Sequence, residues 1–134
     1  MSAIADHPSI DELDHLSEVT SAVPLDREQV ITALRRIEQG LLEHARGLDR
    51  EGGLLDEEDK AARMSLFRED ERLRHEVSQL IRDVGEVRRE AKSGVDDDEL
   101  RRQLATTIAH LRGHRDAEAS LVLESVATDV GSGD

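Results

Sequence analysis

The chain of 134 residues contains no cysteine. This absence excludes disulfide bonds, thiolate zinc sites, iron–sulfur clusters and cysteine nucleophiles. Long apolar runs are missing too, and no stretch approaches the length of a membrane-spanning helix. The N-terminus shows no basic region followed by an apolar run, so we expect no signal peptide. These absences predict a protein that does not enter membranes and that resides in the cytoplasm.

Aromatic residues are nearly absent: they make up 1% of the chain, which has one Phe and neither Trp nor Tyr. Runs of β-branched and aromatic residues, which are typical of strands, are missing as well. Hydrophobic residues amount to 37% and charged residues of mixed sign to another 37%, a balance typical of amphipathic helices rather than of a disordered chain. The core must therefore consist of Leu, Ile, Val and Ala, which predicts an all-α fold.

Positive charge is in the minority, with 18 Lys and Arg residues against 31 Asp and Glu residues and a formal net charge of -13. An acidic surface repels phosphate groups. This disfavours binding to nucleic acids and to anionic membrane surfaces.

Apolar residues recur at steps of three and four, which predicts helices. Pro8 suits the first turn of a helix, Pro24 ends that helix, and Asp26 with Gln29 resembles a capping box that starts the next. We expect helices over roughly 8–22, 26–48, 57–91 and 96–127.

Short connections between long helices favour antiparallel neighbours. We therefore predict one domain over residues 1–128, an antiparallel up-and-down four-helix bundle, with a disordered tail at 129–134. The first helix is the shortest, so a three-helix bundle with a loose N-terminal arm is the alternative.

Two of the six histidines fall on or beside apolar stripes. His44 lies three residues after Leu41, inside the stripe of the second predicted helix. On the fourth, His114 follows Leu111 by three residues, and Glu118 lies one turn further along the same face. An imidazole and a carboxylate one turn apart can bind the same iron inside a bundle. Burying both without a metal or a partner is costly.

Three motifs occur in a suggestive order. Asp6-His7 precedes a short apolar segment, His44 lies on the second predicted helix, and the fourth carries His114 and Glu118. This order resembles the hemerythrin-like family, whose members carry D-H, then H-x-x-x-E on the second helix, His on the third and H-x-x-x-E on the fourth. The resemblance extends over nearly the whole chain.

The resemblance implies a hemerythrin-like bundle that binds non-haem iron, as a di-iron centre. Such a protein binds dioxygen or senses oxygen, iron or redox state. The metal ligands that it implies are His7, His44, His114 and Glu118, with His75, Asp49 and Asp70 as weaker candidates.

The chain departs from the family pattern at several positions. The carboxylate expected four residues after His44 is Leu48, and Asp49 comes one residue later. On the third predicted helix the only histidine, His75, lies nearly opposite the apolar stripe, whereas Asp70 faces inward. The aromatic residues that usually frame the metal in this family are almost absent.

These departures leave a second interpretation open. A histidine on an apolar helix face is commonly a hydrogen-bonded core residue, and His44 on its own fits that description. The alternative is a metal-free bundle with a degenerate site, which acts as an interaction or regulatory protein through its acidic surface or as a homodimer. An enzyme is not indicated, because no catalytic constellation occurs beyond the possible iron site.

Overall fold

The computed structural model describes the backbone of residues 10–51 and 64–132, and the side chains of residues 11–48 and 64–124. The described chain forms helices α1 (Ile10–Ser21), α2 (Arg27–Glu51), α4 (Met64–Lys92) and α5 (Asp97–Ser132). No strand occurs within these ranges. The all-α fold expected from the composition is confirmed.

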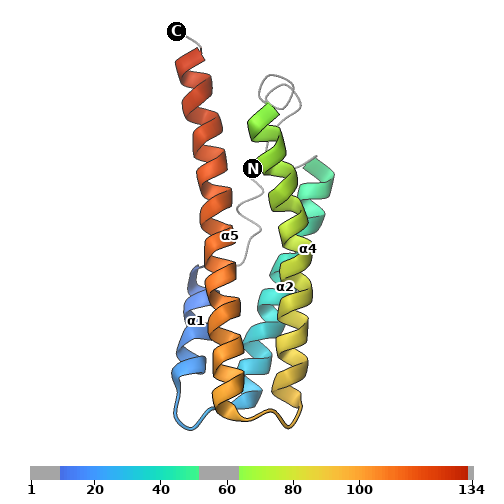
Figure 1. Cartoon of the computed structure of the whole chain (residues 1–134), viewed down its shortest axis with the longest axis vertical. Coiled ribbons are helices and arrows are strands. Elements are labelled where there is room, and N and C mark those ends of the chain that lie inside the picture. The colour runs from blue at the N-terminus through green and yellow to red at the C-terminus, as the bar shows by residue number, and fades with distance from the viewer. Residues whose placement is uncertain (1–9, 52–63, 133–134) are drawn as a thin grey trace.

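The helices form a bundle in which each packs against two neighbours. The pairs in contact are α1 with α2, α2 with α4, α4 with α5 and α5 with α1. This closed ring places α2 and α5 at opposite corners. Successive helices run in alternate directions, as Figure 1 shows. The structure is therefore the predicted four-helix bundle, and because α1 packs on both α2 and α5, the three-helix alternative is wrong.

Aspartates cap two of the helices. The Asp26 side chain accepts hydrogen bonds from the backbone N–H groups of Glu28 and Gln29, at 3.1 and 3.3 Å. Asp96 accepts one from the backbone N–H of Glu99 at 2.8 Å. Such caps satisfy N–H groups that have no partner within the helix. The cap predicted at Asp26 is confirmed.

Two arginines join the connections at one end of the bundle, which we call the turn end. Arg27, at the start of α2, donates to the carbonyl of Ser93 at 3.3 Å and pairs with Asp97 at 2.9 Å. Arg101, on α5, donates to the carbonyls of Thr20 and Ala22 at 3.2 and 2.8 Å. The chain segments that follow α1 and α4 are thereby tied to the helices beside them.

The main hydrophobic core fills the half of the bundle nearest the turn end. All four helices contribute to it, and the segment between α1 and α2 adds Leu25. The fully buried leucines and isoleucine of this core are Leu13, Leu16, Leu34, Ile37, Leu41, Leu100, Leu104 and Leu111. Burying such side chains contributes about 1.5–3 kcal/mol each, which makes this core the main source of stability.

One predicted boundary is wrong. Helix α5 continues to Ser132, so residues 129–132 are helical rather than part of a disordered tail. The C-terminal part of α5 contains no proline that would stop the helix. Each residue added to an existing helix gains one hydrogen bond, so the helix continues. At the other end of the chain, residues 1–9 lie outside the described part, as do residues 57–63 of the third predicted helix.

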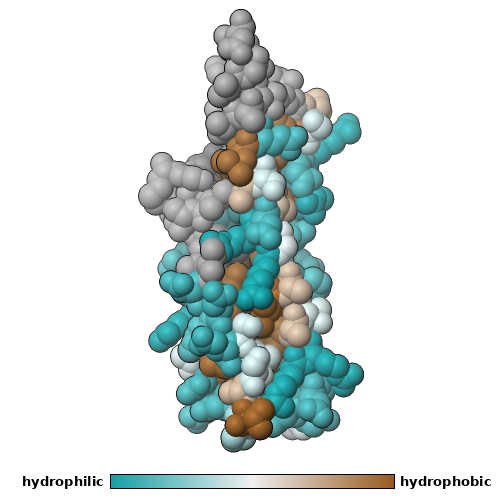
Figure 2. Space-filling view, turned by 90° about the vertical axis from the view of Figure 1, so that its left-hand side faces the viewer, coloured by the Kyte–Doolittle hydropathy of each residue, from teal (hydrophilic) through white to brown (hydrophobic). Residues whose placement is uncertain are grey.

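The side of the bundle drawn in Figure 2 is predominantly polar. Figure 2 shows one side of the molecule, on which hydrophilic side chains surround a narrow strip of apolar ones that follows the helices. None of the described helices combines the length and the apolar character needed to cross a bilayer.

Candidate metal centre

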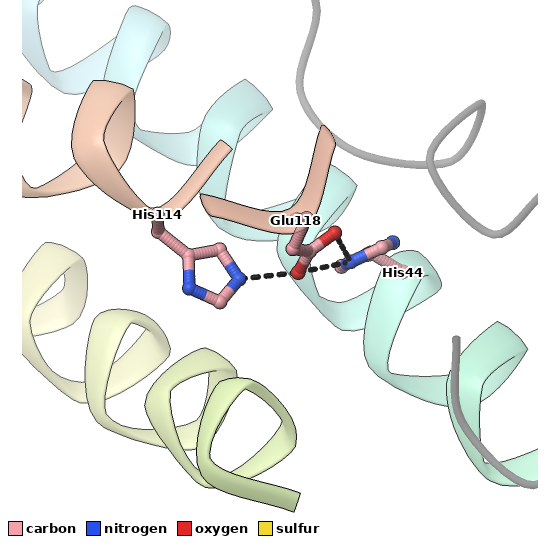
Figure 3. Close-up of side chains that lie close together, drawn as sticks. All are labelled: His44, His114 and Glu118. Atoms are coloured by element: carbon pink, nitrogen blue, oxygen red, sulfur yellow. Dashed lines mark hydrogen bonds and ion pairs between the residues drawn. The ribbon is translucent and has the colours of Figure 1, made fainter. Parts of the chain in front are cut away.

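Three buried polar side chains converge inside the bundle, next to the main core on the side away from the turn end. They are His44 on α2 and His114 and Glu118 on α5, with exposed fractions of 0%, 1% and 1%. One nitrogen or oxygen atom of each lies within 4.8 Å of the others. Figure 3 shows the Glu118 carboxylate between the two imidazoles. We call these three residues the His–Glu cluster.

Helix periodicity explains how the cluster forms. His44 continues the buried stripe of α2, three residues after Leu41. His114 follows the buried Leu111 by three residues, and Glu118 follows one turn later on the same inward face of α5. Since α2 and α5 occupy opposite corners of the bundle, their inward faces meet at its centre.

Glu118 accepts hydrogen bonds from both histidines. His44 Nε2 lies 2.9 Å from Oε1 and 2.8 Å from Oε2 of Glu118. His114 Nε2 also bonds to Oε1 of the same carboxylate. An ionised carboxylate can only accept, so each Nε2 carries a hydrogen in the metal-free protein.

The electrostatics of the cluster favour its charged form. Burial raises the pKa of Glu118, but the hydrogen bonds and charges of His114 and His44 outweigh this and lower that pKa to about 2. Burial alone would lower the pKa of His114. The hydrogen bond and charge of Glu118, followed by those of Glu76, overcome this and raise it. The metal-free cluster therefore holds Glu118 as an anion and shifts His114 toward its cationic form.

Helix α4 adds a residue that the sequence analysis did not predict. The Glu76 carboxylate lies 2.6 Å from His114 Nδ1, on the edge of the ring away from Glu118. Glu76 comes three residues after the buried Leu73 and four before the buried Leu80, so it borders the stripe of α4. This spacing indicates that Glu76 lies at the edge of the buried face. It does not indicate that His114 on the neighbouring helix lies opposite.

The structure does not bring the other candidate ligands into the cluster, or does not describe their side chains. His75 on α4 is exposed, so the structure does not support it as a ligand; its side chain points away because Leu73 and Val77 set the inward face. Asp70 is fully buried, as its periodicity predicts, but it is not among the grouped donors. Asp49 belongs to α2, although its side chain lies outside the described part, and His7 lies outside it altogether.

Apolar side chains flank the cluster beyond the main core. Leu48 occupies the position at which the hemerythrin-like pattern has a carboxylate. It packs against Val77. A further group joins Leu66 and Leu73 with Leu121. The cluster is therefore a polar layer between apolar layers, and the low polarity around it strengthens the interactions among its charges.

A pocket of about 450 Å³ lies between α4 and α5 beside the cluster. Glu76 and His114 form part of its wall, together with Gly113. An added Cβ at Gly113 would meet no atom within 4 Å. The pocket brings solvent close to the Nδ1 edge of His114.

The donor set fits a transition-metal ion. Two imidazole nitrogens and one carboxylate are ligands that non-haem Fe(II) and Zn(II) accept, and three protein ligands leave further coordination positions open. Both Nε2 atoms already face the Glu118 carboxylate. A metal ion there would replace the Nε2 hydrogens, because a coordinating histidine must release the proton from its ligating nitrogen.

Comparison with known proteins gave no relative. No protein-family model matches the chain, and neither a curated protein nor a solved structure matches it. The assignment of a function consequently depends on the cluster itself.

Proposed function

We propose that this protein is a hemerythrin-like bundle that binds non-haem iron through His44, His114 and Glu118. One observation carries the proposal: three buried donor atoms from two helices converge within 4.8 Å of one another. Bringing two imidazoles and a carboxylate together in an apolar interior is costly unless they are paired or bind a cation. These donors suffice for one ion, and a second ion of a di-iron centre would need further ligands, for which His7, Asp49 and Asp70 remain candidates.

Each residue would have a distinct task in such a site. His44 and His114 would coordinate through Nε2, and Glu118 would neutralise one charge of a divalent ion. A bound iron ion supplies reversible redox change and affinity for dioxygen, which suits oxygen binding or the sensing of oxygen, iron or redox state. The apolar groups around Leu48 and Leu73 would limit the access of water.

A metal-free bundle is the second candidate, and a specific observation favours it. Hydrogen bonds from His44 and His114 to Glu118, and from His114 to Glu76, already satisfy much of the polar capacity of the cluster. Leu48, in place of a carboxylate, also fits a degenerate site. In this case the protein would act through its acidic surface, on another protein or on a second copy.

Metal analysis separates the two candidates. The protein is purified anaerobically, loaded with Fe(II), freed of excess metal and assayed for bound iron, and its visible absorption is recorded before and after exposure to oxygen. We expect retained iron and an absorption change in the wild type. His44→Gln and His114→Gln should lose both.

His110→Gln is the matched control, because His110 lies on α5 one turn before His114 but is exposed. It should retain iron like the wild type. Failure of the wild type to retain iron, together with a melting temperature that neither iron nor a chelator changes, would reject the proposal in favour of the metal-free bundle.

A further inference from the structure

The two nitrogens of His114 face different surroundings. Nε2 bonds to Glu118 inside the cluster. Nδ1 lies 2.6 Å from Oε1 of Glu76, a carboxylate that comes from another helix and borders the pocket between α4 and α5. The imidazole is therefore held at both edges, with one edge toward the interior and the other toward solvent.

Glu76 is itself held in place. Its second oxygen, Oε2, accepts a hydrogen bond from Arg72 Nη1 at 3.1 Å. Arg72 is also held by Glu69, to which its Nε donates at 3.0 Å. The chain of contacts thus runs from the surface of α4 through Glu76 to the ring of His114.

A carboxylate on Nδ1 decides which nitrogen of an imidazole can bind a metal. Because the carboxylate accepts, the hydrogen stays on Nδ1 and the lone pair becomes available on Nε2. The same hydrogen bond fixes the rotation of the ring and raises the basicity of the ligating nitrogen. In this site Nε2 is the nitrogen that faces His44 and Glu118.

We propose that Glu76 is a positioning residue, which holds His114 in the orientation and tautomer that present Nε2 to a metal ion in the His–Glu cluster. The inference rests on the proposed metal-binding function. Glu76 would not coordinate the ion, because it lies at the opposite edge of the ring from the cluster.

The test compares variants of Glu76 with a matched variant on the same helix. Glu76→Ala removes the contact, whereas Glu76→Gln keeps an acceptor oxygen without the charge. Glu69→Ala is the control, because it also contacts Arg72 and its side chain is similarly exposed, at 40% against 34% for Glu76. Circular dichroism verifies that each variant is folded.

Affinity is measured with Co(II), by calorimetry and by visible absorption, which reports coordination geometry. We expect Glu76→Ala to lower the affinity about 10- to 100-fold and to alter the Co(II) spectrum. Glu76→Gln should lose less, and Glu69→Ala should resemble the wild type. Equal affinity and an unchanged spectrum in Glu76→Ala would overturn the inference, as would an equal loss in Glu69→Ala.

Nitrogen-15 NMR of the metal-free protein provides a readout that does not need the metal. His114 should carry a hydrogen on Nδ1 in the wild type, and this preference should weaken in Glu76→Ala. If the wild type binds neither Co(II) nor Fe(II), the proposed function fails. An unchanged His114 signal in Glu76→Ala would instead refute the positioning role itself.

Discussion

The two halves of the bundle bury different kinds of side chain. Toward the turn end, four helices bring together aliphatic side chains such as Leu16, Leu34 and Leu104. At the next level the centre is occupied by His44, His114 and Glu118. The aliphatic half is stabilised by removing apolar surface from water, which needs only the right size and pattern. The polar level requires each donor to meet an acceptor, so its members depend on one another.

This difference implies that the two levels respond in opposite ways to substitution. Replacing a core leucine by a smaller residue always leaves a cavity. In the cluster, removing one member takes a hydrogen-bonding partner away from a buried polar group, whereas removing all three together leaves no such group behind. Single and combined substitutions therefore distinguish the levels.

The largest expected effect is that of Glu118→Leu. His114 would lose its buried carboxylate partner and keep only Glu76, which is half-buried and lies at the other edge of the ring. We expect the free energy of unfolding of the metal-free protein to fall by about 3–5 kcal/mol, measured by urea denaturation.

The control is the triple variant His44→Leu, His114→Leu and Glu118→Leu. It should be as stable as the wild type or more stable by about 1–4 kcal/mol, because an apolar layer replaces the buried ion pair. A triple variant less stable than Glu118→Leu would show that the cluster does not behave as one unit.

Leu104→Ala tests the aliphatic half. Leu104 is fully buried in the main core, so we expect a loss of about 2–5 kcal/mol in the free energy of unfolding. The affinity of the folded protein for Co(II) should stay unchanged, since Leu104 lies two to three turns from His114 along α5. A large change in affinity would mean that the core and the cluster are coupled.

Changes in pH should alter the stability of the protein less than these substitutions do, because protonation removes no side chain. The pKa of Glu118 is lowered from 4.5 to about 2, so its pairing stabilises the fold above pH 4.5 and is lost as the pH falls toward 2. The pKa of His114 is raised above 6.5, so its contribution is complete below pH 6.5 and is lost as the pH rises through the raised value.

The melting temperature of the metal-free wild type, measured relative to that of the triple variant, should therefore be highest between pH 4.5 and 6.5 and should fall toward either extreme of pH. Thermal unfolding followed by circular dichroism at a series of pH values measures this. Parallel profiles for the two proteins would contradict the charged pairing of His114 with Glu118.

The smallest effect is expected at Gly113, beside the pocket. An added Cβ would meet no atom within 4 Å, so Gly113→Ala should benefit from the higher helix propensity of alanine without a clash. We expect a gain of about 1 kcal/mol in the free energy of unfolding, with Co(II) affinity retained. A loss of stability would indicate that the backbone at this point of α5 needs the freedom of glycine.

The periodicity of the sequence predicted much of the fold and part of the site. The apolar stripe through Leu41 correctly placed the core face of α2, and Asp26 marked its start. The same reasoning placed His44 and Glu118 inside the bundle, and both are buried. Such predictions succeed because a helix repeats its geometry regularly, so spacing alone decides which side chains share a face.

Other features were beyond the reach of spacing. Glu76 looked like an ordinary residue at the edge of a stripe, and its contact with His114 depends on how α4 lies beside α5. Asp70 was rightly expected to face inward, yet the structure does not group it with the cluster. The end of α5 was placed too early, because no proline stops the helix there and each added residue gains a hydrogen bond.

By itself the sequence determined the kind of molecule: cysteine-free, acidic, all-helical and built around aliphatic stripes, because composition and periodicity act locally along each helix. Tertiary structure alone decided that His44 meets His114 and Glu118 at one level, and that Glu76 meets the far edge of the same imidazole. Those contacts join residues from different helices. They therefore depend on the relative height and rotation of the helices, which the packing of the whole bundle sets.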